Sequence, residues 1–371
     1  IYIYGEAGQS VRYAIAIVYK YSKGNLVEVF NGEKFSKKYS CISRYLEKYR
    51  IEIICKLYER KYIMDIENSS NDYLKQIYTK TIDTAYNEMG TGCYNDQWQW
   101  DQGVMLYGLV KAHEKTKDEK IYEFMKYWID YHLERRDFGL SINTTAPLLG
   151  VVYLLEQGEK DERYTEVCKR FADWCMAEAP RADLGTFEHS CTANKYPNQI
   201  WADTLFMGCL FLVKWGKFTG EDMYIKEAVR QFCLHYHFLS DSETGLIYHG
   251  YDCNVREHKG VFWGRGNCWL AAAGAEVLNI IGKKSPMWEE IYEIYKRHIW
   301  GVLKFQDNSG GWHTVIDRAD TYIEMSATAA FAFSVMRAVN SGLLDEKYRS
   351  AAEKAYSAVT ADIKDGAVIH G

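Results

Sequence analysis

Asp203 is the first residue whose type and place indicate chemistry, because it stands in the otherwise apolar run QIWADTLFMGCL. Burial among apolar neighbours raises the pKa of a carboxyl group, and a raised pKa suits a general acid near neutral pH. His249, beside Tyr248 in GLIYHGYD, follows a turn and is a second titratable candidate. The structural alternatives are an Asp203 paired with a core arginine and a His249 that is hydrogen-bonded within its own loop.

The segment VFWGRGNCW places one arginine between two tryptophans. Gly264-Arg265-Gly266 resembles the start of a dinucleotide fingerprint, but Trp269 stands where that fingerprint requires its third glycine. An arginine fork pairs with a carboxylate through two parallel hydrogen bonds, and indoles stack on sugar rings. Trp263, Arg265 and Trp269 therefore predict binding of a ring that carries a carboxylate, with arginine packed on tryptophan as the structural alternative.

Polar and aromatic residues also gather in the other loops that precede strongly apolar helices. The further substrate-binding candidates from these loops are Trp100, Asp101, Asn143, His189 and Gln199. Helix capping alone also explains Asp101 and Asn143. Glu324 and Thr328 lie four residues apart and so share one face of the last apolar helix.

Composition excludes several classes of protein. The chain has 371 residues and a net charge of −5, which argues against a nucleic-acid partner. No apolar run approaches the roughly 20 residues of a membrane span. Ten cysteines without a C-x-x-C pair predict a reducing, cytoplasmic compartment and no structural zinc site.

Hydrophobic periodicity predicts an all-α protein in which two kinds of helix alternate. One kind is apolar and rich in small residues, and the other carries charge on most turns. The helices are expected near 69–89, 100–116, 119–135, 145–157, 161–178, 199–218, 221–238, 264–282, 286–305, 322–341 and 345–363. Short strand pairs are expected around 245–262 and 309–317.

Alternation of inner and outer helices predicts an (α/α)6 barrel over residues 69–371, with the site in a funnel at the N-terminal ends of the inner helices. Such a barrel needs twelve helices, and eleven are expected after residue 69. Residues 1–68 are a segment of uncertain role with two candidate helices, near 6–22 and 43–61. We expect residues 6–22 to supply the missing barrel helix.

Five motifs in order resemble family 105 glycoside hydrolases, the unsaturated rhamnogalacturonyl and glucuronyl hydrolases related to family 88. They are WQWDQGVMLYGLVKAHEKT, NQIWADTLFMGCLFL, TGLIYHGYD, WGRGNCW and GGWHTVIDRADTYIEMSATAAFAF. The resemblance implies an (α/α)6 barrel that removes a 4,5-unsaturated uronic acid from oligosaccharides left by lyases acting on pectin-type chains. It also implies that an aspartate protonates C4 of the vinyl ether and activates water for addition at C5, without metal or cofactor.

By this resemblance Asp203 is the catalytic residue, His249 belongs to the active site, and Trp263, Arg265 and Trp269 form the substrate-binding segment. The chain departs from the family where many members carry another aspartate, because SINTTAP places Asn143 there. An amide holds a hydroxyl but does not share a proton.

Two other functions stay open at this point. A conventional inverting glycosidase needs two carboxyl groups about 6.5–9.5 Å apart, for which Asp101 with Asp203, or Asp203 with Glu324, are the candidate pairs. A catalytically silent carbohydrate-binding protein is the alternative outside enzymes. The sequence does not choose between galacturonyl and glucuronyl substrates or name the leaving sugar, and it leaves a homo-oligomer open.

Overall fold

The computed structural model describes residues 18–22, 25–30, 72–93, 96–135, 138–190 and 195–368. The chain divides into two units, Ile1–Asp72 and Tyr73–Gly371. In the first unit, β1 (Val18–Ser22) and β2 (Asn25–Phe30) pair antiparallel. Residues 18–22 are thus a strand, which corrects the expectation of a helix over 6–22 for that part. Residues 6–17 and the second candidate helix, 43–61, lie outside the described residues.

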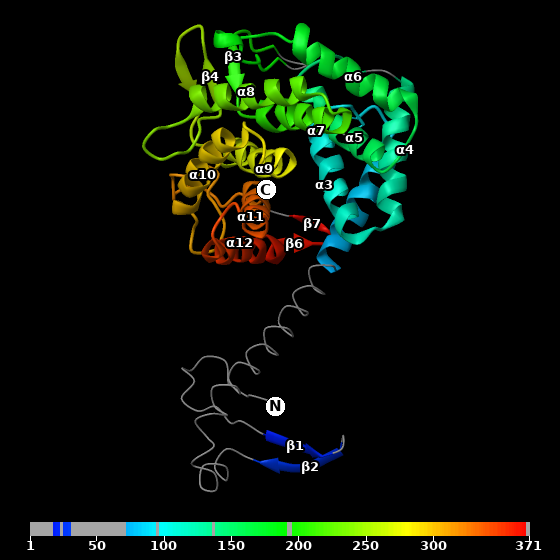
Figure 1. Cartoon of the computed structure of the whole chain (residues 1–371), viewed down its shortest axis with the longest axis vertical. Helices are drawn as coiled ribbons and strands as arrows, with labels where there is room; N and C mark the ends of the chain where they lie inside the picture. Colours follow the sequence, from blue (N-terminus) through cyan, green and yellow to red (C-terminus); the bar gives the residue numbers. More distant parts are fainter. Residues whose placement is uncertain are drawn as a thin grey trace. The chain divides into compact units, whose positions relative to one another are not determined.

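The second unit is an (α/α)6 barrel in which inner and outer helices alternate along the chain (Figure 1). The inner helices are α3 (Trp100–Thr116), α5 (Leu148–Glu156), the π-helical turn η3 (Leu205–Cys209) continued by α7 (Leu210–Thr219), α9 (Gly264–Ile281) and α11 (Met325–Asn340). The outer helices are a helix over 72–88, α4 (Glu119–Arg135), α6 (Glu162–Ala177), α8 (Asp222–Leu239), α10 (Trp288–Lys304) and α12 (Arg349–Ala361). The alternation expected from the sequence is confirmed.

Composition explains which helices lie inside. In α5 every residue from Leu148 to Leu155 is buried, because the helix is covered on all sides. In α6 burial recurs at Tyr164, Val167, Phe171 and Trp174, the spacing of one helical face. The apolar helices therefore surround the axis, and the charged helices cover them.

Short strands are inserted between the helices. β3 (Gln199–Trp201), β4 (Gly250–Asp252) and β5 (Glu257–Lys259) form an antiparallel sheet. The β4–β5 pair falls within the predicted strand region 245–262, which confirms that expectation. The predicted helix start at 199 is wrong, since residues 199–201 pair with β4 and the helix begins after Asp203.

The predicted strand pair around 309–317 is wrong, since Val315 and His313 form only single bridges, to Trp263 and Ile323 outside that region. The last predicted helix ends at Ala361 rather than 363, because Ile363–Lys364 (β6) pairs with Ala367–Val368 (β7). In the described part of the chain, no helix is long and apolar enough to cross a membrane.

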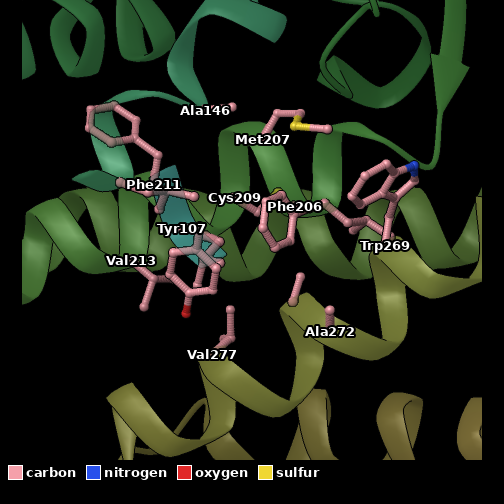
Figure 2. Close-up of a cluster of buried hydrophobic side chains, with 14 of the residues drawn as sticks. Tyr107, Ala146, Phe206, Met207, Cys209, Phe211, Val213, Trp269, Ala272 and Val277 are labelled. Atoms are coloured by element: carbon pink, nitrogen blue, oxygen red, sulfur yellow. The ribbon is translucent and has the colours of Figure 1, made fainter. Parts of the chain in front are cut away.

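Glu276 of α9 links three inner helices through polar contacts in the interior. Its carboxylate accepts hydrogen bonds from the Tyr107 hydroxyl at 2.5 Å and from Nε of Arg337 at 2.8 Å, and it pairs with Nζ of Lys111 at 2.8 Å. Burial raises the pKa of this carboxyl, but these partners outweigh burial and leave it lowered. Apolar side chains from α3, η3 and α9 pack around the same region, Tyr107, Phe206 and Val277 among them (Figure 2).

Candidate active site

The β3–β4 register brings Asp203 to His249. Trp201 pairs with Gly250, and the backbone N–H of Ala202 donates to the carbonyl of His249 at 2.9 Å. Asp203 follows in the turn before η3, and its Oδ2 lies 2.8 Å from Nε2 of His249. Both side chains are about one fifth exposed, Asp203 at 20% and His249 at 21%, so a ligand can reach them. Two sequence candidates thus form one hydrogen-bonded pair.

The Asp203–His249 pair reverses the expected direction of the Asp203 pKa shift. Burial by itself raises the pKa of the carboxyl, as the sequence predicted. The hydrogen bond from His249 and the charges of His249 and His189 outweigh burial, so the pKa of Asp203 is lowered below its ordinary value. The expectation of a raised pKa is therefore wrong, and Asp203 is ionised in the free site.

His249 is also part of a row of four rings, which we call the aromatic wall. Its members Tyr196, Trp201, His249 and Trp263 are all half-buried, and the centroids of successive rings are 4.9, 4.5 and 4.7 Å apart. Tyr196 and Trp201 were not among the sequence candidates. Their closeness in sequence to Asp203 was the signal that could have identified them.

Arg265 extends the wall at its Trp263 end. Its guanidinium carbon lies 4.4 Å from the centroid of the Trp263 ring. Its Nη1 donates to Oε1 of Glu324 at 2.8 Å and to Oγ of Ser326 at 3.2 Å. The side chain is still 36% exposed. Arginine and tryptophan are therefore packed together, as the structural alternative held, while the arginine still faces solvent.

Trp269 does not present a stacking face, which corrects its expected role. The residue is 6% exposed, and its ring packs against that of Phe206 at 5.4 Å (Figure 2). It also packs against the ring of Trp100 at 6.0 Å. Core packing occupies the faces that a sugar would need. Trp100 is half-buried and retains some exposure.

His189 and Gln199 both contact Trp201 of the aromatic wall. His189 is buried, its Nδ1 lies 3.2 Å from Oγ1 of Thr204, and burial lowers the pKa of its imidazole. Gln199 accepts a hydrogen bond from Nε1 of Trp201 at 3.2 Å and donates to Oδ2 of Asp252 at 3.3 Å. Both residues therefore support the side chains that reach solvent.

Asp101 and Asn143 stand at the starts of helical segments. Asp101 lies in the first turn of α3, half-buried, and burial raises the pKa of its carboxyl against the lowering effect of nearby backbone N–H groups. Asn143 begins the 3-10 turn η1 (Asn143–Thr145), half-buried, before α5. Asp101 agrees with the alternative of a charge at a helix start, whereas Asn143 is not the N-cap of η1, a position that Ile142 holds.

Glu324 is not free to act as a second catalytic carboxylate. Its side chain is fully buried. Its Oε1 accepts hydrogen bonds from Arg265 and from the Ser326 hydroxyl. Its Oε2 accepts a hydrogen bond from the Thr314 hydroxyl at 2.8 Å. With both oxygens engaged, Glu324 is not an open base, which counts against Asp203–Glu324, one of the two candidate pairs for the inverting alternative.

A helical barrel that carries an Asp–His pair, an arginine and a wall of aromatic rings at the starts of its inner helices is typical of a carbohydrate-active hydrolase. The comparison with protein families agrees with this class, since the model described as Glycosyl Hydrolase Family 88 matches residues 73–370. The chain belongs to this family and is a glycoside hydrolase.

Individual relatives point the same way. The chain is 35% identical over 254 residues to the unsaturated rhamnogalacturonyl hydrolase YesR of Bacillus subtilis, covering 68% of this chain and 73% of that protein. It is 25% identical over 286 residues to an unsaturated 3S-rhamnoglycuronyl hydrolase of an Alteromonas species, covering 72% and 68%. A solved structure from Salmonella enterica, described as a possible member of glycoside hydrolase family 105, matches with a TM-score of 0.75 and 30% identity, covering 81% of this chain and 84% of that one.

Proposed function

We propose that the enzyme removes a 4,5-unsaturated uronic acid from the non-reducing end of an oligosaccharide, by adding water across the C4=C5 vinyl ether. The observation that carries the proposal is the Asp203–His249 hydrogen bond within the aromatic wall, next to the solvent-facing Arg265. The names of the relatives support it, since they act on unsaturated rhamnogalacturonyl and rhamnoglycuronyl substrates.

The pair supplies both proton transfers. Nε2 of His249 lies 2.8 Å from the Asp203 carboxylate, close enough for one proton to be shared within the pair. This proton passes through Asp203 to C4 of the substrate while a water oxygen bonds to C5, and the proton lost by the water returns to the pair. One water is consumed, and the pair ends in its starting state.

The hydrated sugar then falls apart. Addition at C5 gives a hemiketal, which opens by breaking the bond between C5 and the ring oxygen. C1 is left as a hemiacetal that carries both a hydroxyl and the leaving sugar. Breaking the C1–oxygen bond to that sugar, with transfer of the hydroxyl proton, releases it and leaves an aldehyde at C1.

Different residues along the aromatic wall bind different parts of the substrate. Arg265 binds the uronate carboxylate, because a guanidinium fork matches a carboxylate and the group faces solvent beside Trp263. Trp263 and Trp201 offer ring faces to the sugars, while Trp100, Asp101 and Asn143 bind hydroxyls from the starts of α3 and η1. His189, Gln199 and Trp269 hold these groups in place.

We take the leaving sugar to be rhamnose in fragments of pectin-type chains, by analogy with the Bacillus subtilis relative. A glucuronyl substrate is the second choice. The amide of Asn143, where many family members carry an aspartate, bears on substrate preference without selecting either sugar. All seven cysteines of the described residues are free thiols, which supports a cytoplasmic localisation.

The test is to mix the purified protein with an unsaturated rhamnogalacturonan disaccharide and follow the ultraviolet absorbance of the conjugated double bond. We expect loss of absorbance, with at least about a hundredfold slower loss in Asp203→Asn. Reaction with an unsaturated glucuronyl disaccharide alone would keep the chemistry and change the specificity. Cleavage of the saturated analogue would indicate a conventional glycosidase, and ligand-dependent melting without turnover would indicate a binding protein.

A further inference from the structure

Glu324 is a buried carboxylate whose position calls for an explanation. It precedes α11 directly, and its backbone is fixed by hydrogen bonds from its N–H to the Trp312 carbonyl at 2.9 Å and from the Thr328 N–H to its own carbonyl at 3.0 Å. A fully buried charge is costly unless it is paired and hydrogen-bonded. The Glu324 carboxylate meets that condition through Arg265, Ser326 and Thr314.

The contacts of Glu324 leave part of the Arg265 fork for a ligand. A guanidinium has five N–H donors, of which two are on Nη1. Among the described residues, the hydrogen bonds recorded for the Arg265 side chain are both made by Nη1. Nε and Nη2 therefore keep three donors, on a side chain that is 36% exposed.

Three neighbours restrict how the guanidinium can turn. Trp263 lies under it at 4.4 Å, and Glu324 and Ser326 hold one of its nitrogens. Gly264, next to Arg265, is also anchored on this side, since its N–H donates to the Thr314 carbonyl at 2.8 Å. A long arginine side chain otherwise loses rotamer entropy on binding a ligand, and fixing it in advance removes that cost.

We propose that Glu324 is a positioning residue, which presets the Arg265 fork over Trp263 to receive the carboxylate of the substrate. The inference rests on the proposed function, because it needs a substrate that carries a carboxylate. Glu324 touches no substrate itself and acts through Arg265.

The test pairs a change in the enzyme with a change in the substrate. Glu324→Gln keeps the size of the side chain and removes its charge. For the unsaturated uronide acid we expect KM to rise about tenfold with kcat within about threefold, because the lost interaction binds ground state and transition state alike. For the methyl ester of the same uronide, kcat/KM should be the same in wild type and variant, since the ester offers no carboxylate to the fork.

Glu276→Gln is the matched control. Glu276 is also a buried glutamate on an inner helix and is also bonded to an arginine, Arg337, at 2.8 Å, but it stands apart from the residues of the site. We expect it to lower the melting temperature without changing the ratio of kcat/KM for acid over ester. An equal change in that ratio in both variants, or no change in Glu324→Gln, would overturn the inference.

Ser326→Ala keeps the inference testable should Glu324→Gln fail to fold, as judged by circular dichroism. Ser326 bonds both Arg265 and Glu324, so we expect KM for the acid to rise about threefold and kcat/KM for the ester to stay unchanged. Absence of that selective rise would count against the inference. Failure of the wild type to turn over either substrate would instead refute the proposed function, on which the inference depends.

Discussion

Nε2 of His249 lies 2.8 Å from Oδ2 of Asp203, although 46 residues separate the two in sequence. The antiparallel pairing of β3 with β4 over three residues sets this distance. Because Trp201 pairs with Gly250, the residue after Trp201 lies opposite His249, the residue before Gly250. The pairing is short, but Ala202 and His249 extend it by one backbone hydrogen bond. The ionisation state of the site therefore depends on strand register, in a barrel built otherwise from helices.

The first prediction concerns the pKa of Asp203. His249→Phe keeps an aromatic ring between Trp201 and Trp263 but removes the hydrogen bond and the charge that lower this pKa. Burial then acts against the charged carboxylate with less opposition, so the pKa of Asp203 should rise. Titration of its carboxyl carbon by NMR measures the change.

Asp252 in the same spectra is the internal control, because its hydrogen-bonding partners Lys259 and Asn254 are untouched by the substitution. An Asp203 midpoint that stays in place or falls in His249→Phe would show that His249 does not hold the carboxylate ionised.

The second prediction compares two glycines of α3. A Cβ on Gly103 would stand 2.4 Å from the Ala146 Cβ and 2.5 Å from its backbone carbon, where the turn before α5 passes. A Cβ on Gly108 meets nothing within 4 Å among the described residues. Gly103→Ala should therefore lower the free energy of unfolding by about 3 kcal/mol. Gly108→Ala should raise it by about 0.5–1 kcal/mol, since alanine favours a helix.

Urea unfolding of the two variants beside the wild type measures both effects. Similar stabilities for the two variants would mean that α3 and the 143–147 turn are not in close contact, and would place Asn143 elsewhere.

The helices were predictable because their signal is local. In α9 and α10 the 3.6-residue pattern of apolar side chains lies within each segment, so the predicted bounds 264–282 and 286–305 are close to Gly264–Ile281 and Trp288–Lys304. Trp263, Arg265 and His249 were identifiable as candidates from their types, and the structure places the three next to one another.

The rest depends on contacts between distant residues. β3 has three residues, too few to show alternation, and it is stabilised by a strand about 50 residues away. The predicted direction of the Asp203 pKa shift was wrong for the same reason. His249, which lowers this pKa against the effect of burial, is 46 residues away in sequence. Burial of Trp269 likewise follows from Trp100 and Phe206, which other helices contribute.

The third prediction uses the raised pKa of Asp101. A carboxyl whose pKa is raised by folding contributes its stability below the unfolded pKa, near 4, and loses it as the pH rises through the folded value. Asp101→Asn should therefore raise the free energy of unfolding at pH 7, by less than about 1 kcal/mol because partial exposure screens the charge. The gain should disappear below about pH 4.

Urea unfolding at the two pH values checks this prediction. A variant less stable than the wild type at pH 7 would contradict it, and would show that attraction of the carboxylate to the N-terminus of α3 exceeds the cost of burial.

The last prediction concerns Asn267, a fully buried residue of α9 that joins the two halves of the site. Its Oδ1 accepts from the Ile247 N–H at 2.9 Å, and its Nδ2 donates to the carbonyls of Ile247 at 2.8 Å and Trp263 at 3.0 Å. Burial lowers the pKa of His298 to about 3, so its ring is neutral and its Nε2–H donates to Oδ1 at 3.1 Å. One amide thus fixes the backbone two residues before His249 and two residues before Arg265.

Asn267→Leu keeps the approximate size of the side chain and leaves the N–H and carbonyl of Ile247 and Nε2 of His298 without these hydrogen bonds. The Trp263 carbonyl keeps the bond from the backbone N–H of residue 267 at 3.0 Å. At about 1–3 kcal/mol for each stranded group, the free energy of unfolding should fall by about 3–5 kcal/mol in total. Asn279→Leu on the same helix removes a single bond, from Nδ2 to the Ala275 carbonyl, at a half-buried position, and should change stability by no more than about 0.5 kcal/mol. Asn267 holds the backbone of Ile247, two residues before His249, and that of Trp263. We therefore expect kcat/KM to fall in Asn267→Leu even at temperatures where the variant is fully folded. Equal stability of the two variants, or full activity of folded Asn267→Leu, would show that the wall holds its geometry without this amide.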